Sequence, residues 1–327
     1  MKRMLYIFAA CILLGAGACN NAPEDLFGVS ASDRIEECLA DYRFALQARG
    51  QWVMEYFPGY EQEYGGWIYV VEFRADNTVR AWFEGSTFVN PEFMAVESDY
   101  EVKFSTGPML TFNTFNEYLH YFDYPGTNGG YQSYRGDHEF SLMSMSGNYD
   151  EIMMRGLKSH NAIRMTPLPE GYTPERYIGY VRESQKSVPQ TTLRVLANGR
   201  QVAVMTRENL FSEDSFESYW QSKVWTISYD CMRQVMTDMG VPAVDASGNP
   251  VYEVQTVREQ LSTIVFPDRS MRLYAPYVFK GNIVCDGEEI DYMDGESMQC
   301  FDRHVGATED SDFFICSDSF IDFRLVP

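Results

Sequence analysis

The sequence predicts a mainly β protein with a few helices, built as two antiparallel barrel-like or sandwich-like units that each follow a helix. Aromatic residues are abundant (22 Phe, 22 Tyr and 5 Trp), and many alternate with polar residues, as in half-buried strands. Turn residues separate these runs at short intervals, which is typical of antiparallel sheets. A helical pattern followed by strands occurs twice. The predicted units span residues 33–169 and 170–327.

Residues 1–18 predict a lipoprotein signal peptide. A basic start precedes an apolar run that ends at Leu14 and is too short to cross a bilayer as a helix. Small residues then lead to Cys19, an order that resembles a bacterial lipobox, although Leu is commoner at the place of Ala16. An ordinary cleavage site before a cysteine is the alternative. We expect Cys19 to carry the lipid (palmitate), and residues 19–32 to form a lipidated tether.

The first predicted helix spans residues 33–48. Asp33 with Glu36 suits its N-terminus, in the manner of a capping box, and Gly50 suits its end in a left-handed conformation. Cys38 falls on its apolar stripe and is predicted to belong to the core.

The second predicted helix spans residues 174–187, with Thr173 as N-cap and Pro174 at the first helical position. Asn198-Gly199 between two apolar runs is the strongest hairpin signal in the chain. Residues 212–218 are polar and predict a loop. Residues 228–240 fit either a helix or two short strands.

The chain is strongly acidic, with a formal net charge of −21. Such a surface repels nucleic acid and anionic lipid head groups, so we expect no nucleic-acid partner. A cation, a basic protein or a neutral sugar is compatible with this charge, and solubility alone also explains it.

The cysteines that follow Cys19 do not determine a disulfide pattern. With Cys38 in the core, Cys231, Cys285, Cys300 and Cys316 remain in the C-terminal half. An exported protein can form disulfides. The chain has no C-x-x-C pair, so the sequence gives little support to a zinc site.

Catalytic and metal motifs are largely missing from the sequence. His138-Glu139 is followed by Leu142 where an H-E-x-x-H helix needs its second histidine. Hard cations prefer oxygen ligands, and one segment is rich in acids, but its spacing breaks the EF-hand register. These acids are Asp286, Glu288, Glu289, Asp291, Asp294 and Glu296. We interpret them as a solvated acidic hairpin and predict no metal or cofactor.

A tyrosine-rich stretch is the candidate ligand-binding site. Aromatic rings around a polar, Gly-rich centre can stack on sugars while their hydroxyls form hydrogen bonds. Packing of the same rings at a barrel mouth is the alternative. The candidate residues are Tyr118, His120, Tyr121, Tyr124, Tyr131 and Tyr134.

Several short motifs together resemble a family of Bacteroidota lipoproteins that is classified as a domain of unknown function. They include Asp25-Leu26-Phe27, Gly50-Gln51-Trp52-Val53-Met54-Glu55-Tyr56, Gly65-Gly66-Trp67, Leu110-Thr111-Phe112-Asn113-Thr114-Phe115-Asn116 and Met165-Thr166-Pro167-Leu168. The resemblance covers nearly all of the mature chain and weakens between about residues 206 and 260. Members are often encoded beside a Sus-type transporter and its surface lipoprotein partner. The resemblance implies an outer-membrane accessory role and carries over no active-site residues.

The expected function is therefore that of a non-catalytic accessory or ligand-binding lipoprotein in outer-membrane nutrient uptake. The expected partners are the outer membrane, which the protein contacts through its lipid, a Sus-type transporter complex and a glycan. The protein is expected on the cell surface or on the periplasmic face of the outer membrane. A hydrolase that uses a pair of acidic residues is one alternative. A structural partner of an outer-membrane complex is the other.

Overall fold

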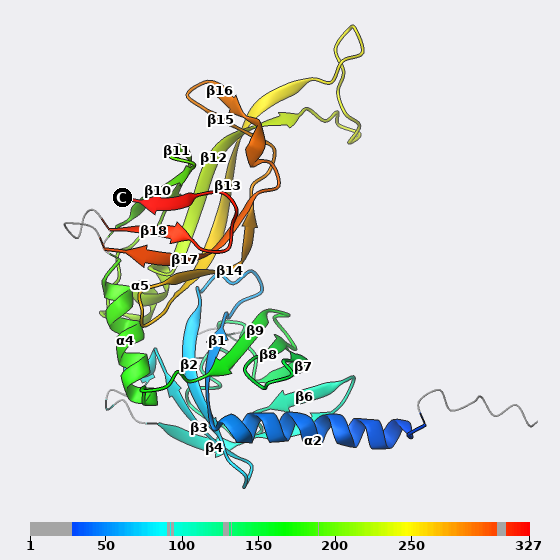
Figure 1. Cartoon of the computed structure of the whole chain (residues 1–327), viewed down its shortest axis with the longest axis vertical. Coiled ribbons are helices and arrows are strands. Elements are labelled where there is room, and N and C mark those ends of the chain that lie inside the picture. The colour runs from blue at the N-terminus through cyan, green and yellow to red at the C-terminus, as the bar shows by residue number, and fades with distance from the viewer. Residues whose placement is uncertain are drawn as a thin grey trace, which may run out of the picture.

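Figure 1 shows the computed structural model of the chain. The structure describes residues 28–327 except 90, 91, 93, 94, 127–130, 132, 189 and 306–311. The predicted signal peptide, Cys19 and most of the tether lie outside the described residues.

The first sheet of the described chain is a meander that curls into a nearly closed barrel. Its order is β4-β3-β2-β1-β9-β8-β7-β6-β5, and every pairing is antiparallel. The two edge strands, β4 and β5, are separated in the chain by Tyr100 alone. The chain itself therefore joins the two edges of the sheet, which protects them from pairing with other chains. The strands are β1 (Gln51–Tyr56), β2 (Trp67–Phe73), β3 (Thr78–Phe83), β4 (Val96–Asp99), β5 (Glu101–Phe104), β6 (Pro108–Thr111), β7 (Glu139–Met145), β8 (Ile152–Gly156) and β9 (Ala162–Pro167).

The second sheet repeats this plan. Its strands follow the order β11-β10-β19-β18-β17-β14-β13-β12, and β11 also pairs with β12, which closes the ring. The hairpin β15–β16 is attached to β12 beside the ring. The strands are β10 (Thr192–Ala197), β11 (Arg200–Thr206), β12 (Val224–Gln234), β13 (Tyr252–Val265), β14 (Met271–Val278), β15 (Asn282–Cys285), β16 (Glu288–Ile290), β17 (Ser297–His304), β18 (Phe313–Cys316) and β19 (Phe323–Val326), and a 3-10 turn, η1, covers Asp291–Met293.

A helix precedes each barrel, as predicted. The helix α2 (Ala31–Arg49) lies across one end of the first barrel (Figure 1), and its buried Leu39, Tyr42 and Leu46 join that barrel's core. The helix α4 (Pro174–Lys186) runs beside both barrels. Two shorter helices are α3 (Ser86–Val89) and α5 (Phe216–Gln221).

The helix ends test the predicted caps. Thr173 caps α4 by accepting a hydrogen bond from the Arg176 amide, and Gly50 ends α2 with a positive φ of 71°, both as predicted. The capping role of Asp33 was wrong, because Ser30 caps α2 and accepts from the Asp33 amide at 3.1 Å. Asp33 instead lies in the first turn, where its charge suits the helix dipole.

The first barrel has strands buried on both faces because α4 covers part of its outer wall. Trp52 and Met54 point into the barrel core, whereas Val53 between them joins a second cluster outside it. That cluster contains Ile178 of α4 and Ile264 of β13. A layer of apolar side chains therefore joins the two barrels.

Polar contacts reinforce the junction. The Gly66 amide donates to the Thr263 carbonyl at 3.1 Å, and the Ala162 amide donates to the Tyr274 hydroxyl at 2.9 Å. A Cβ at Gly66 would come within 2.3 Å of Ile264 Cγ1, so only glycine permits this approach.

The predicted fold class is confirmed: the protein is mainly β, with two barrels that each follow a helix. The Asn198-Gly199 hairpin is present, with φ of 50° and 80° at the two turn residues. Residues 228–234 belong to strand β12, which resolves the helix-or-strand alternative there. The loop predicted for 212–218 was wrong at its end, because Ser215 caps α5 and the helix begins at Phe216.

Candidate functional site

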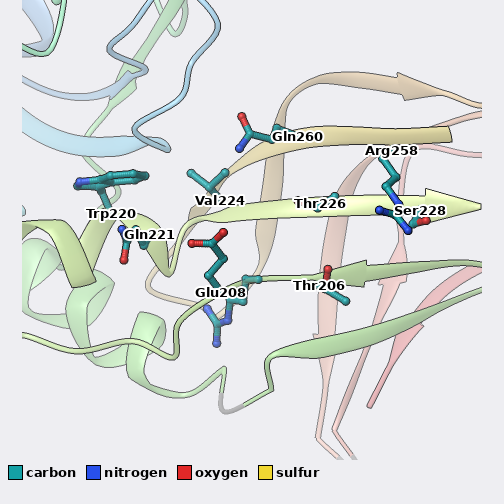
Figure 2. A pocket seen from close by; sticks show the side chains of 10 residues that line it. Thr206, Glu208, Trp220, Gln221, Val224, Thr226, Ser228, Arg258 and Gln260 are labelled. Carbon is teal, nitrogen blue, oxygen red and sulfur yellow. The ribbon is translucent and has the colours of Figure 1, made fainter.

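A groove of about 480 Å³ lies on the outer face of the second barrel, where α5 meets β11, β12 and β13 (Figure 2). This volume falls within the range of about 300–1,000 Å³ that is usual for small-molecule sites. We call it the Trp220 groove. It is lined by Thr206, Arg207, Glu208, Trp220, Gln221, Val224, Thr226, Ser228, Arg258 and Gln260.

Strand alternation explains why the wall of the groove is polar. In β12, Trp225 and Ile227 point into the barrel core, so Thr226 and Ser228 point outward. Arg258 and Gln260 extend the same outer surface on β13, and β12 pairs with β13 throughout this region.

The helix α5 supplies the aromatic end of the groove. The preceding cap, Ser215, accepts a hydrogen bond from the Ser218 amide at 3.0 Å. Tyr219 is fully buried in the core of the first barrel and anchors the helix. Trp220 is consequently held at the rim, where its ring meets the Tyr64 ring edge-on at 5.4 Å.

Arg207 organises the floor of the groove. Its guanidinium donates to the Gln190 carbonyl at 2.9 Å and to the Ser222 carbonyl at 2.6 Å, and it lies 4.7 Å from the centre of the Trp225 ring. Burial lowers the pKa of Arg207 to about 10. Arg207 therefore has a structural role: it joins the loop that follows α4 to the segment just before β12.

Most other polar side chains of the groove form neither a hydrogen bond nor an ion pair with the described part of the chain. Among the described residues, Thr206, Thr226, Ser228 and Gln260 make no side-chain hydrogen bond, and the indole N–H of Trp220 makes none either. Glu208 and Arg258 also form no ion pair within the described chain. The groove therefore offers hydroxyl, amide, indole and guanidinium groups beside one aromatic ring.

The predicted tyrosine site divides into a packed part and an exposed part. Tyr118 is completely buried in the first barrel's core, and this burial raises its pKa to about 12. Tyr121 and Tyr134 are partly buried against the same core, with parallel rings 6.0 Å apart. Tyr124 is exposed, and Tyr131 is 90% exposed. The structure therefore does not bring the five rings to one surface.

Tyr131 lines a smaller cavity of about 200 Å³. The other lining residues are Tyr60, Asp123, Pro125, Arg135 and Lys158. The Gly-rich centre of the predicted site, residues 127–130, lies outside the described residues.

His120 is built into the loop rather than presented by it. Its Nδ1 accepts a hydrogen bond from the Asn116 amide at 3.1 Å, and its ring stacks on His138 with centres 5.0 Å apart. His138 Nδ1 lies 2.5 Å from Asp123 Oδ2, and Lys158 contacts the other oxygen of Asp123. Burial lowers the pKa of His120, and the charge of His138 lowers it further.

The acidic segment 286–296 makes its polar contacts with neighbouring parts of the second barrel. Glu288 pairs with Arg200 at 2.9 Å, and Asp294 accepts from the Gly281 amide at 2.7 Å. In the described part of the chain, no three His, Cys, Asp or Glu residues are grouped so that they could hold a metal ion. The described cysteines, at positions 38, 231, 285, 300 and 316, are free thiols.

The sequence interpretation missed the Trp220 groove. Its residues come from α5, β11, β12 and β13 and from the two residues after β11, and the one local signal was Trp220, two positions beyond the polar segment 212–218 that we interpreted as a loop. Over the described residues, no helix is both long and apolar enough to cross a membrane.

Comparison with known proteins identifies a family for the chain. No curated protein and no solved structure matches the chain. A family model described as "Domain of unknown function (DUF4302)" matches residues 23–286, which cover the first barrel and the second as far as β15. The chain belongs to this family of unknown function.

Proposed function

We propose that the protein is a membrane-anchored, non-catalytic binding protein that captures a neutral, polyhydroxylated ligand such as a glycan segment in the Trp220 groove. The observation that carries the proposal is the set of groove polar groups that make no hydrogen bond within the described part of the chain: the side chains of Thr206, Thr226, Ser228 and Gln260, and the indole N–H of Trp220. Polar groups that the fold leaves unused in a concave site are available to a ligand.

The chemistry of the groove favours a sugar over a charged ligand. An indole face packs against the C–H face of a sugar ring, and hydroxyl and amide groups hydrogen-bond to its hydroxyls. Three charged residues of the described chain line the groove: the Arg207 guanidinium is engaged by backbone carbonyls, and Glu208 and Arg258 contribute opposite charges, so the groove has no large excess of charge of either sign. The acidic chain as a whole, at −21, repels polyanions.

The sequence of the N-terminus supports membrane anchoring. A signal peptide over residues 1–18 followed by a lipidated Cys19 would hold the protein at the outer membrane. The resemblance to Bacteroidota lipoproteins encoded beside Sus-type transporters supports a role in nutrient uptake. We therefore propose that the protein assists such a transporter complex by holding its glycan substrate at the cell surface or the periplasmic face.

The same groove disfavours hydrolysis by two carboxylates. Glycosidases of the usual kind place two acidic side chains about 5–10 Å apart around the scissile bond. Among the described residues that line the Trp220 groove, Glu208 is the single carboxylate. Binding without turnover is thus the simpler reading of the site.

A screen of immobilised neutral and anionic glycans tests the proposal. We expect retention of neutral oligosaccharides, and no new reducing ends when a bound oligosaccharide is incubated with the protein and analysed by chromatography. Release of reducing ends would instead establish the hydrolase. Retention of no glycan, together with co-purification of a transporter, would establish the structural partner.

A further inference from the structure

A long arm projects from the second barrel. The strands β12 and β13 continue beyond the ring, and the connection between them extends away from both barrels (Figure 1, yellow-green to yellow). We define the arm as residues 234–254. Beyond the β12–β13 pairing, the connection folds into two short hairpins, one bridged by Met236 with Pro242 and the other by Val244 with Pro250.

The arm has a defined local structure. The Asp245 carboxylate accepts hydrogen bonds from the Ser247 amide at 2.8 Å and from the Asn249 amide at 2.9 Å. These bonds lower the pKa of Asp245. The Thr237 amide donates to the Val241 carbonyl at 2.8 Å and closes a second turn. Its side chains are therefore presented on a paired scaffold.

Apolar side chains are concentrated on this arm and point into solvent. Met239 is 88% exposed, and the other five are about half exposed. Few monomeric proteins keep such a run of apolar side chains without a binding role. The six residues are Met236, Met239, Val241, Val244, Tyr252 and Val254.

One backbone edge of β13, which begins in the arm and runs on toward the ring, is also unpaired in the described chain. β13 pairs with β12 along Tyr252–Ser262, but with β14 only at Thr263–Val265. A long strand edge without a ladder partner readily accepts another chain.

The charge of the arm selects among possible occupants. The sequence from Gln234 to Val257 contains no Lys or Arg, whereas Asp238, Asp245 and Glu253 are acidic. An anionic lipid surface would be repelled, since membrane-binding segments rely on Lys and Arg. A second copy of this chain, itself at −21, would be repelled as well.

We propose that the arm is the docking surface for a partner protein whose contacting surface is apolar at its centre and basic at its rim. The exposed apolar side chains supply the contact area, and the acidic residues set its orientation and its partner choice. The proposal is independent of ligand binding in the Trp220 groove, which lies at the base of β12.

Site-specific photo-crosslinking in cells that produce the full-length chain tests the arm. A photoreactive amino acid replaces Met239 in one variant and Phe320 in a control. Phe320 is fully exposed on the β18–β19 connection, outside the arm. We expect a discrete adduct with one other protein from position 239 and none from position 320.

Two changes then test the chemistry. The charge-reversal variant Asp238→Lys, Glu253→Lys, which leaves the turn held by Asp245 intact, and the double variant Val241→Ser, Val244→Ser should each reduce the adduct at least fivefold. High salt should reduce it in the parent. Melting temperatures should stay within a few degrees because all these side chains are exposed.

An adduct with a second copy of the chain, equal adducts at both positions, or no adduct would overturn the proposal, as would an adduct insensitive to charge reversal. Binding of the purified chain without its lipid to vesicles of phosphatidylglycerol would also overturn it. That result would make the arm a membrane-binding element.

Discussion

Lys223 and Glu84 form an ion pair in the interior of the junction between the two barrels. Their side chains are 1% and 0% exposed. Lys223 also donates to the Gly66 carbonyl at 2.7 Å, and Glu84 accepts from the Tyr219 hydroxyl and from the Ile68 amide, both at 2.8 Å. Burial lowers the pKa of Lys223, while the Glu84 carboxylate opposes that shift. The pair therefore joins the barrels through residues 139 positions apart.

Removing one partner of this pair should destabilise the protein strongly. Lys223→Met leaves the Glu84 carboxylate buried without a cation, which costs about 3–5 kcal/mol in comparable pairs. The double variant Glu84→Gln, Lys223→Met removes both charges and should recover much of that loss. Chemical denaturation with circular dichroism measures the free energies of unfolding.

The matched control is Lys103→Met. Lys103 pairs with Glu139 at 3.5 Å on the surface, and breaking an exposed pair costs about 1 kcal/mol or less. A Lys223→Met variant as stable as this control would contradict a structural role for the buried pair.

His120 should make stability depend on pH. Burial and then His138 lower its pKa below the ordinary value of about 6.5. Below pH 6.5 the unfolded chain takes up a proton that folded His120 resists, so this contribution is present above pH 6.5 and is lost as the pH falls through the folded pKa.

The variant His120→Gln should therefore lose less stability than the parent between pH 7.5 and 5.5, as measured by chemical denaturation at both values. His304→Gln, at an exposed position, should keep the parent's pH dependence. Equal pH dependence in the parent and in His120→Gln would show that His120 does not contribute.

The tyrosines of the predicted site should separate into two classes. Tyr118→Ala removes a fully buried ring and should cost about 3–5 kcal/mol. Tyr124→Ala and Tyr131→Ala remove exposed rings and should change stability by about 0.5 kcal/mol or less. Thermal melting tests this. A large loss of stability in Tyr131→Ala would contradict its placement at the surface.

The lipid anchor is a prediction from the sequence alone. Cys19→Ser should abolish labelling by a palmitate analogue and release the protein from the membrane fraction. Ala16→Leu, which improves the match to a lipobox, should retain both properties. Unchanged labelling of Cys19→Ser would exclude this cysteine as the attachment site.

The parts of the fold that could be predicted are those that short local sequence signals specify. Asn198-Gly199 specified a two-residue hairpin because both residues accept positive φ, and Thr173-Pro174 specified a helix start. Closure of the barrels depends on pairs such as β1 with β9 and β10 with β19, which are remote in sequence. No local pattern encodes these pairs.

The site was harder to predict for the same reason. The tyrosines from Tyr118 to Tyr134 look alike in sequence, but the barrel buries some and exposes others. Trp220 becomes part of a groove only because Tyr219 anchors α5 in the first barrel while β12 and β13 belong to the second. Such a juxtaposition follows from how the barrels pack and not from residue spacing.

The proposed binding site predicts a graded set of affinity losses. Trp220→Ala should weaken oligosaccharide binding about ten- to hundredfold, the effect of losing roughly 1–3 kcal/mol of apolar contact. Thr226→Val and Gln260→Ala should each weaken it about three- to tenfold, because each removes one hydrogen bond of about 0.5–1.5 kcal/mol. Thr192→Val, on an exposed part of β10 outside the groove, is the matched control.

Isothermal titration of the purified protein with the neutral oligosaccharide best retained in the screen is the most direct test. The account predicts the highest affinity for the parent and Thr192→Val, a lower affinity for Thr226→Val and Gln260→Ala, and the lowest for Trp220→Ala. The melting temperatures of the threonine and glutamine variants should be unchanged. Parent-like affinity in Trp220→Ala and Gln260→Ala would contradict the assignment of ligand binding to the Trp220 groove.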